Sequence, residues 1–181
     1  LAAYGGLNYI SFRNNKIFQV NKVIVADHIR RHFEKHLMLY FTGFSRIAST
    51  IAKHQVQNIN TKEKELQTMY EMVPHALDLF RNNQMKKFGQ LLNESWQIKR
   101  ELSNKVTTPM IDRIYKSAIS AGALGGKLIG AGGGGFMLLF VPPSKQKRVK
   151  DKLKKLLLVP IKTETAGSQV IFYQPNGGHD K

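Results

Sequence analysis

Glycines gather in one short stretch of the sequence, residues 122–135, which reads GALGGKLIGAGGGG. Eight of the fifteen glycines of the chain lie there, and the apolar run FMLLFV follows directly. Glycine loses more backbone freedom on folding than other residues, so such density is retained where the chain needs positive φ angles or where another group approaches closely. Consecutive N–H groups in such a segment can bind an anion, or the segment can pack beneath another loop that does so. The alternative is a tight helix-to-strand connection without a ligand.

Two well-known phosphate-binding loops do not fit this stretch. A Walker loop needs a glycine where Ala121 stands and a hydroxyl-bearing residue where Leu128 follows Lys127. Gly130, Gly132 and Gly135 satisfy the Gly-x-Gly-x-x-Gly spacing, but the dinucleotide fingerprint follows a strand and opens a helix. Here a helical pattern precedes the glycines and a strand pattern follows them, so any phosphate site is of another kind.

Other candidate residues have simpler explanations. His28, His32 and His36 are spaced by four residues and would share one helix face, but no carboxylate motif accompanies them, so we expect no metal site. Asp112 falls in the first turn of a predicted helix, where an acidic side chain complements the helix dipole. We expect this role, rather than catalysis, for Asp112.

Composition excludes several classes of protein. The 181 residues include no cysteine, which excludes disulfides and thiolate zinc sites. No apolar run approaches the roughly 20 residues of a membrane span, and the first residues do not resemble a signal peptide. We therefore expect a cytoplasmic protein with no membrane partner.

The charge is strongly positive, with 28 Lys and Arg against 12 Asp and Glu, a net charge of +16. Such a field attracts polyanions: nucleic acid, an anionic membrane or small phosphorylated molecules. The densest cluster, residues 144–160, places Val149, Leu153, Leu156 and Leu157 on one face of a predicted helix. This pattern is typical of an ordinary surface helix with lysines facing solvent.

Strand and helix patterns together predict an α+β fold. We expect strands within residues 5–25, with a hairpin turn at 13–15, and at 36–44, 135–142 and 168–175. We expect helices at residues 45–57, 60–82 with an interruption at Pro74, 83–102 and 144–160. A further helix has Thr108 as its N-cap and Pro109 at its first position, and stops at Gly122. The predicted core is one layer of helices on a small antiparallel sheet.

Four separated blocks resemble a known superfamily. The block GALGGKLIGAGGGGFMLLFVP resembles the C-terminal glycine motif of the GHMP kinases, which include galactokinase, homoserine kinase and mevalonate kinase. The blocks AAYGGLNYISF, LYFTGFSRIASTIAKHQ and LLNESWQIKRELSNKVTTPMIDRIYKSA resemble the sugar-1-kinase branch, in particular the D-glycero-D-manno-heptose 7-phosphate kinases. The blocks occur in the expected order and cover nearly the whole chain.

The resemblance implies transfer of the γ-phosphoryl group of ATP, with Mg²⁺, to the anomeric hydroxyl of a phosphorylated heptose. That reaction serves nucleotide-sugar and lipopolysaccharide synthesis. The family has two domains with the site between them, so residues 1–30 would end the N-terminal domain and residues 31–181 would form the C-terminal domain. A homodimer is compatible with the family.

One family motif is absent. The Gly-Leu-Gly-Ser-Ser-Ala type of loop that surrounds the ATP phosphates occurs nowhere in the chain, and the acidic catalytic residue normally precedes the Ala-Ala-Tyr-Gly-Gly block, at which this sequence begins. We therefore expect the C-terminal portion of such a kinase, inactive without the N-terminal half as its partner. The catalytic residues of this chain are unknown.

The resemblance also implies site residues. The six residues of the third family motif, which would shape the phosphate and nucleotide site, are Gly130, Ala131, Gly132, Gly133, Gly134 and Gly135. The residues expected to bind or border the sugar phosphate are Thr42, Ser45, Arg46, Tyr4, Gly5 and Gly6. Arg46 could bind the substrate phosphate in bidentate fashion or form an ordinary surface ion pair, and Gly5-Gly6 could equally be a plain turn.

Two other functions stay open. A kinase acting on fucose or another sugar of the same branch fits nearly as well as a heptose phosphate kinase. A nucleic-acid-binding module would explain the net charge, but its lysines should alternate with exposed aromatic residues or lie on a recognised motif, and neither pattern occurs. We therefore expect small-molecule partners and no nucleic acid.

Overall fold

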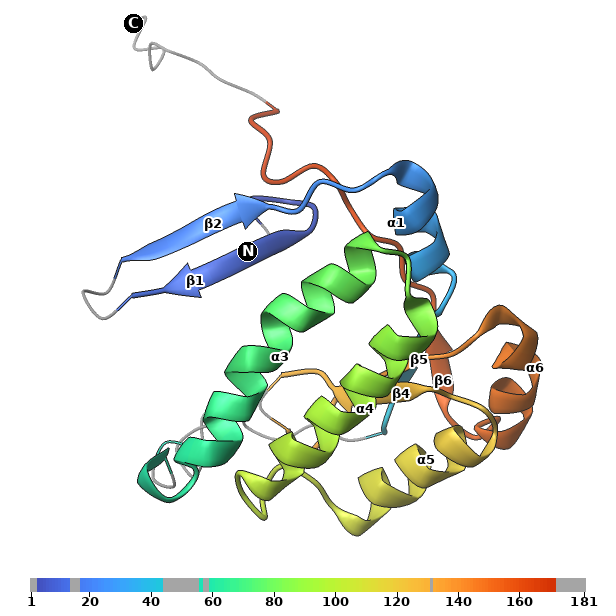
Figure 1. The fold of residues 1–181 in the computed structure, drawn as a ribbon. Helices are drawn as coiled ribbons and strands as arrows, with labels where there is room; N and C mark the ends of the chain where they lie inside the picture. Colours follow the sequence, from blue (N-terminus) through green and yellow to red (C-terminus); the bar gives the residue numbers. More distant parts are fainter. Residues whose placement is uncertain (1–2, 14–16, 44–55, 57–58, 131, 172–181) are drawn as a thin grey trace, which may run out of the picture. The chain divides into compact units, whose positions relative to one another are not determined.

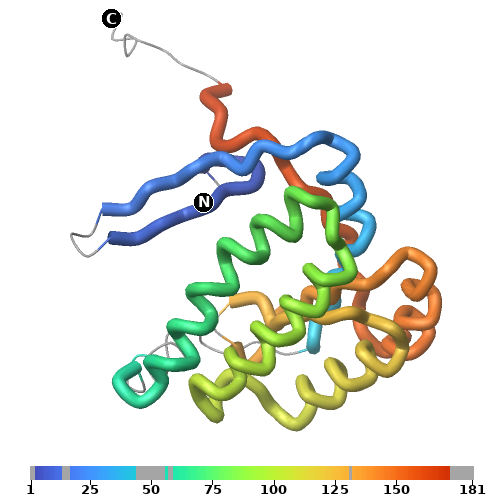
Figure 2. Tube along the Cα trace, viewed as in Figure 1, coloured from blue at the N-terminus to red at the C-terminus, as the bar shows by residue number. Residues whose placement is uncertain are grey.

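The computed structural model describes residues 3–13, 17–43, 56, 59–130 and 132–171. The chain divides into two compact units, one formed by residues 1–25 with 162–181 and the other by residues 26–161. Figure 1 labels the elements, and Figure 2 follows the path of the chain through them. The assignment of residues 1–30 to a separate kinase domain stays a prediction.

The first unit contains a hairpin of two antiparallel strands. Strand β1 (Asn8–Phe12) pairs with β2 (Phe18–Lys22), so that Asn8 lies opposite Lys22 and Phe12 opposite Phe18. The ring centroids of Phe12 and Phe18 lie 6.4 Å apart, a cross-strand aromatic contact at the end of the pairing next to the turn. The alternating sequence predicted this hairpin, and part of the predicted turn lies outside the described residues.

The second unit is built on a four-stranded antiparallel sheet with the strand order β4-β5-β3-β6. Strand β3 (Leu37–Phe41) lies inside the sheet, where Leu39 faces Leu138 of β5 (Phe136–Phe140) on one side and Val159 of β6 (Leu157–Val159) on the other. Strand β4 (Gly125–Leu128) forms one edge and pairs only with β5.

Helices accompany this sheet (Figure 1). The described helices are α1 (Asp27–Glu34), α3 (Glu63–Arg81), α4 (Met85–Glu101), α5 (Pro109–Ser120) and α6 (Pro143–Lys152), with a 3-10 turn at Ile59–Thr61. Helix α5 begins as predicted, because the N–H of Ile111 donates to the side chain of Thr108, and the helix stops before Gly122, whose φ is +111°. Within the described residues, none of the helices has the length and apolar character needed to cross a membrane.

The main cluster of the core lies on one face of the sheet, and a smaller aromatic group lies on the other. Side chains alternate along a strand, and in β5 Met137 and Leu139 are fully buried together with Ile111 and Ala118 of α5 and Trp96 of α4. Phe140 belongs to the opposite set and contacts the rings of Phe33, His36 and Phe88 at centroid distances of 4.9 to 5.5 Å. The apolar pattern of residues 136–141 therefore fills both sides of the sheet, as a central strand requires.

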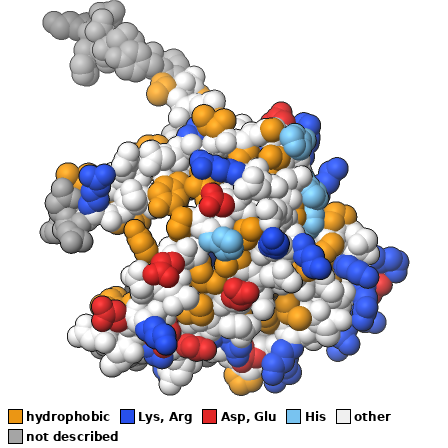
Figure 3. Space-filling model, in the orientation of Figure 1, with side chains coloured by type: hydrophobic (Ala, Val, Ile, Leu, Met, Phe, Trp, Pro, Cys, Tyr) orange, Lys and Arg blue, Asp and Glu red, His pale blue; other side chains and the backbone are white. Residues whose placement is uncertain are grey.

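The lysine-rich region near the end of the chain differs in part from its prediction. Helix α6 presents its lysines to solvent and buries Val149, as expected, and Figure 3 shows Lys and Arg side chains gathered over it. The helix ends at Lys152, however, and Leu157 lies in β6 with 65% of its surface exposed. Pairing with β3 therefore replaces the helical pattern in residues 157–159.

Three more predicted elements need correction. Helix α3 runs through Pro74 without the predicted interruption. Residues 125–128 of the glycine stretch form a strand rather than a loop, because Gly125 and Gly126 lack side chains where the backbones of α4 and β5 come close. Residues 168–171, the described part of the last predicted strand, form no strand. The helix predicted at 45–57 lies almost entirely outside the described residues.

Candidate functional site

The conformation of residues 129–135, the glycine segment between β4 and β5, explains the density of glycines. The φ angles of four of its residues are positive: +87° at Gly130, +119° at Gly132, +76° at Gly133 and +96° at Gly135. Residues with a Cβ atom rarely adopt these conformations, so the segment depends on glycine at each of the four positions. Ala131 lies outside the described residues.

The middle of the glycine segment, Gly132 and Gly133, contacts the turn that precedes α5. The N–H of Gly133 donates to the carbonyl oxygen of Val106 at 2.8 Å, and Val106 is completely buried. A Cβ atom on Gly132 would lie 2.7 Å from the same oxygen. The two backbones therefore touch directly, which only glycine permits, and the N–H of Gly133 is already used within the fold.

The end of the segment is held by the residue after β3. Both the N–H and the hydroxyl of Thr42 donate to the carbonyl oxygen of Gly135, at 2.9 and 2.8 Å. Thr42 is fully buried. The structure thus brings Thr42 and the glycine segment together, although they are 93 residues apart. Ser45 and Arg46, predicted from the same block, lie outside the described residues.

Two lysines that the sequence analysis did not select lie beside the segment. The ammonium group of Lys99, in the last turn of α4, donates to the carbonyl oxygen of Gly130 at 2.7 Å. Burial, together with the smaller effect of the positive charge of Lys127 on β4, lowers the pKa of Lys99 to about 8. Burial also lowers the pKa of Lys127. The glycine segment therefore adjoins two partly desolvated cations, whose only sequence signal was Lys127 within the GGKLIG run.

Tyr4, Gly5 and Gly6 belong to the first unit. Gly5 and Gly6 have φ angles of +60° and +68°, and a Cβ atom on Gly5 would collide with the backbone of Ala166. The N–H of Gly6 donates to the carbonyl oxygen of Glu164 at 2.9 Å. These contacts account for both glycines as a turn packed against residues 164–167. Tyr4 is exposed over 55% of its surface and available for contacts of another kind.

The histidines and Asp112 have structural contacts. The Nδ1 atoms of His32 and His36 lie 2.7 Å from the side-chain oxygen of Asn83 and 2.8 Å from the carbonyl oxygen of His32, and His36 stacks on Phe140. In the part of the chain that the structure describes, no three His, Asp or Glu side chains gather as metal ligands. Asp112 pairs with Arg100 at 3.0 Å and accepts a hydrogen bond from Thr107 at 2.7 Å.

Comparison with known proteins places this architecture in a family. Residues 76–157 match the profile of the GHMP kinases C terminal domain. The chain is 36% identical over 157 residues to the D-glycero-alpha-D-manno-heptose 7-phosphate kinase of Campylobacter jejuni, which covers 85% of this chain and 46% of that protein. It is 28% identical over 139 residues to the L-fucokinase/L-fucose-1-P guanylyltransferase of Bacteroides fragilis, covering 74% of this chain and 14% of that protein.

Solved structures agree on the fold. The D-glycero-D-manno-heptose 1-phosphate kinase of Bacteroides thetaiotaomicron superposes with a TM-score of 0.65 at 22% identity, over 92% of this chain and 45% of its own. The L. major mevalonate kinase superposes with a TM-score of 0.69 at 18% identity, over 92% and 51%. The chain thus spans about half the length of these kinases and of its Campylobacter relative. It carries the C-terminal domain of the GHMP kinase family.

Proposed function

We propose that this chain is the C-terminal part of a sugar kinase that transfers the γ-phosphoryl group of ATP to the anomeric hydroxyl of D-glycero-D-manno-heptose 7-phosphate. The observation that carries the proposal is the 36% identity to a heptose 7-phosphate kinase over 85% of this chain. The product would feed the synthesis of a nucleotide-activated sugar.

The glycine segment supports a phosphoryl-transfer site. Phosphoryl transfer depends on positioning and on positive charge near the phosphates, with little covalent chemistry by the protein. The contacts of Gly133 with Val106 and of Gly135 with Thr42 hold the segment in one conformation. A segment fixed in advance can support a nucleotide loop packed against it without reorganising during the reaction.

Substrate recognition would involve the residues that the family resemblance named. Arg46 and Ser45 would bind the phosphate of the sugar, with Thr42 holding the start of their segment against Gly135. A guanidinium group suits this role because it forms two parallel hydrogen bonds with a phosphate. Tyr4, Gly5 and Gly6 would border the sugar.

The cofactors of the proposed reaction are ATP and Mg²⁺. ATP supplies the transferred group when bound, and Gly130–Gly135 with Lys99 would lie on the phosphate side of its site. Magnesium would accompany the phosphates of ATP, since the described residues offer no cluster of three acidic or histidine ligands for it. The catalytic acid is not assigned to any residue of this chain.

A fucose kinase is the second candidate, because the Bacteroides fragilis relative is 28% identical over 74% of this chain. The two candidates differ in one chemical feature of the acceptor, its distal phosphate. A site with a phosphate-binding arginine should strongly prefer the phosphorylated sugar, since an unpaired buried cation is costly.

A comparison of three sugar acceptors tests the proposal. A kinase that contains residues 1–181 together with the preceding half of such an enzyme is given ATP and, in turn, heptose 7-phosphate, unphosphorylated heptose and fucose. We expect kcat/KM for heptose 7-phosphate to exceed the other two values by at least a factor on the order of 100, as the loss of charge-assisted hydrogen bonds implies. A preference for fucose would select the second candidate, and transfer to none of the three would reject both.

A further inference from the structure

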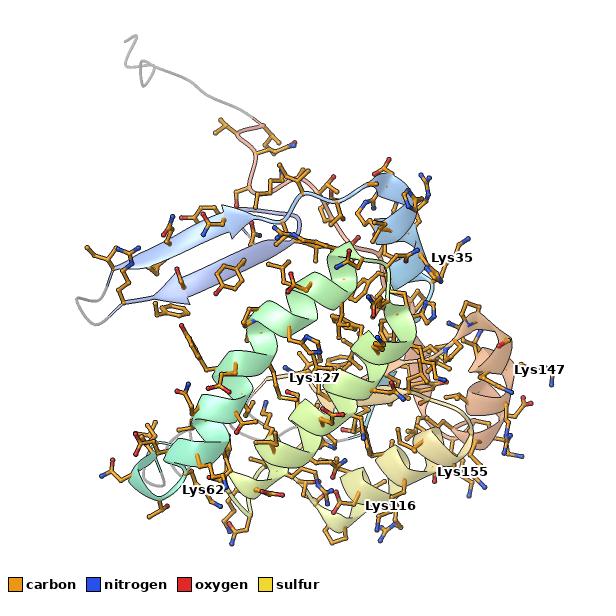
Figure 4. The ribbon with its side chains drawn as sticks, in the orientation of Figure 1. Lys35, Lys62, Lys116, Lys127, Lys147 and Lys155 are labelled. Atoms are coloured by element: carbon orange, nitrogen blue, oxygen red, sulfur yellow. The ribbon has the colours of Figure 1, made fainter. Side chains whose placement is uncertain are left out.

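Lys99 and Lys127 are an unusual feature of the second unit. Burial lowers the pKa of both amines, and the charge of Lys127 also contributes to the lowered pKa of Lys99. Lys127 lies on β4 just before the glycine segment, and Lys99 touches the segment at Gly130. In Figure 4 Lys127 lies between the ribbons of α3 and α4, whereas Lys116 and Lys147 lie at the edge of the view.

No carboxylate among the described residues neutralises this pair. Each ion pair of the described chain involves other cations, and the nearest in sequence joins Asp112 to Arg100 rather than to Lys99. The ammonium group of Lys127 forms no hydrogen bond within the described residues. Two partly buried like charges with no carboxylate partner among the described residues are unfavourable, so such an arrangement indicates a function rather than a contribution to stability.

The two ammonium groups of the pair have hydrogen-bonding capacity that the described residues do not use. A lysine ammonium group carries three N–H donors, and Lys99 spends one on Gly130. Two donors of Lys99 and three of Lys127 remain for an acceptor with several oxygens and a negative charge. No atom of the described residues lies within 4 Å of the place that a Cβ on Gly130 would take, so the described part of the chain leaves space for a ligand there.

We propose that Lys99 and Lys127 form an anion-binding pair that binds a phosphate oxyanion of a ligand beside the glycine segment. Lys99 would join that anion to the backbone of Gly130, so that binding also fixes the start of the segment. The presence of the anion site does not depend on the proposed kinase reaction. Only the identity of the ligand, ATP or the sugar phosphate, rests on it.

Binding of inorganic tripolyphosphate to the 181-residue chain tests the pair directly. We expect calorimetric titration at pH 7 and low salt to show binding that Lys127→Met and Lys99→Met each weaken about 10-fold or more, since each removes a charged donor. Lys127→Arg should retain most of the affinity. Lys116→Met, on the exposed face of α5, removes the same formal charge and should change the affinity less than 2-fold.

Thermal unfolding without a ligand separates binding from folding. Lys127→Met should unfold at the same temperature as the wild type or higher, because an apolar side chain replaces a desolvated charge, and tripolyphosphate should no longer raise that temperature. If Lys127→Met destabilises the chain, Lys127→Gln provides the second variant of similar length. Unchanged tripolyphosphate affinity in folded Lys127 and Lys99 variants, an equal loss in Lys116→Met, or no binding by the wild type would overturn the proposal.

Competition identifies the source of the phosphate. ATP that displaces tripolyphosphate would assign the pair to the nucleotide, and heptose 7-phosphate that does so would assign it to the acceptor. Displacement by neither would overturn the pair as a ligand site. A chain that binds tripolyphosphate through this pair, within a kinase that leaves every tested sugar unchanged, would retain the anion site and reject the proposed reaction.

Discussion

Gly132 meets two separate demands, a φ angle of +119° and direct contact with the backbone of Val106. Gly135 meets only the first, since its φ is +96° and no atom lies within 4 Å of the place that a Cβ would take. The comparison of these two glycines therefore separates backbone strain from close approach.

Gly132→Ala should destabilise the second unit more than Gly135→Ala. Both replacements place a Cβ in a disfavoured backbone region, at a cost of about 1 to 2 kcal/mol each. Gly132→Ala must in addition move Val106, whose carbonyl oxygen would lie 2.7 Å from the new Cβ. Urea unfolding of both variants measures the difference in free energy, and equal losses would contradict a role for close packing.

Arg46→Ala tests recognition of the substrate phosphate in the proposed kinase. We expect KM for the phosphorylated sugar to rise by a factor on the order of 10 to 100, as loss of a charged hydrogen bond implies, with little change in KM for ATP. Arg113→Ala, an exposed arginine on α5, is the matched control. An equal rise for both substrates would indicate that Arg46 supports the fold instead.

The pH dependence of stability reports on Lys99. Its pKa is about 8 in the folded chain against the ordinary 10.5, so between these values the unfolded chain binds more protons. Stability rises with pH under that condition, and Lys99 therefore contributes stability above pH 10.5 that is lost as the pH falls through 8. Urea unfolding at pH 7 to 10 should show a smaller rise in Lys99→Met than in the wild type. Parallel curves would contradict a lowered pKa.

At the scale of elements, local signals predicted what local interactions build. Helix α5 carries its own N-cap at Thr108, a proline at its first position and a glycine after its end, so its bounds could be predicted from the sequence. Strand β4 could not be predicted from the sequence, because Gly125 and Gly126 are poor strand formers. Contact with α4, which is distant in the sequence, and pairing with β5 make it a strand, and neither is encoded in residues 125–128 themselves.

The candidate site divides in the same way. The glycine segment was predictable from composition, since no other residue accepts its backbone angles. The contact of Thr42 with Gly135 was not predicted, because the family resemblance named both residues without joining them. Lys99 and Lys127 could not be selected among 28 basic residues, because desolvation depends on the tertiary environment of each side chain.

Thr108→Ala should shorten or loosen the start of α5. The hydroxyl of Thr108 accepts from the N–H of Ile111 at 3.3 Å, and removing such a cap costs about 1 kcal/mol. Thr108→Ser keeps the oxygen and should cost far less. Chemical denaturation of the two variants compares them, and a loss as large in Thr108→Ser would show that the methyl group, not the cap, matters.

At the scale of the whole molecule, the length of the relatives bears on activity. The chain covers 46% of the Campylobacter heptose 7-phosphate kinase, and it contains no Gly-Leu-Gly-Ser-Ser-Ala type of sequence. In-line transfer requires the γ-phosphate and the acceptor hydroxyl to be held together, which one loop alone does not achieve.

Residues 1–181 alone should therefore consume no ATP in the presence of heptose 7-phosphate, whereas a polypeptide in which they follow the N-terminal half of a kinase of the proposed type should. A coupled assay of ADP release measures both, with heat-denatured protein as the background. Turnover by residues 1–181 would contradict this expectation, and Asp27 and Asp112 would then be the first acids to replace.

The first unit has a further consequence for the order of events during synthesis. Its hairpin at residues 8–22 is synthesised before the residues that hold the turn preceding it. The N–H of Gly6 donates to the carbonyl oxygen of Glu164, and the N–H of Ser168 donates to that of Ala3 at 3.0 Å. On the ribosome, residues 26–161 can complete their own sheet and core before those partners emerge. Until residues 164–168 emerge, the turn before the hairpin lacks these two backbone hydrogen bonds, so this part of the first unit is completed last.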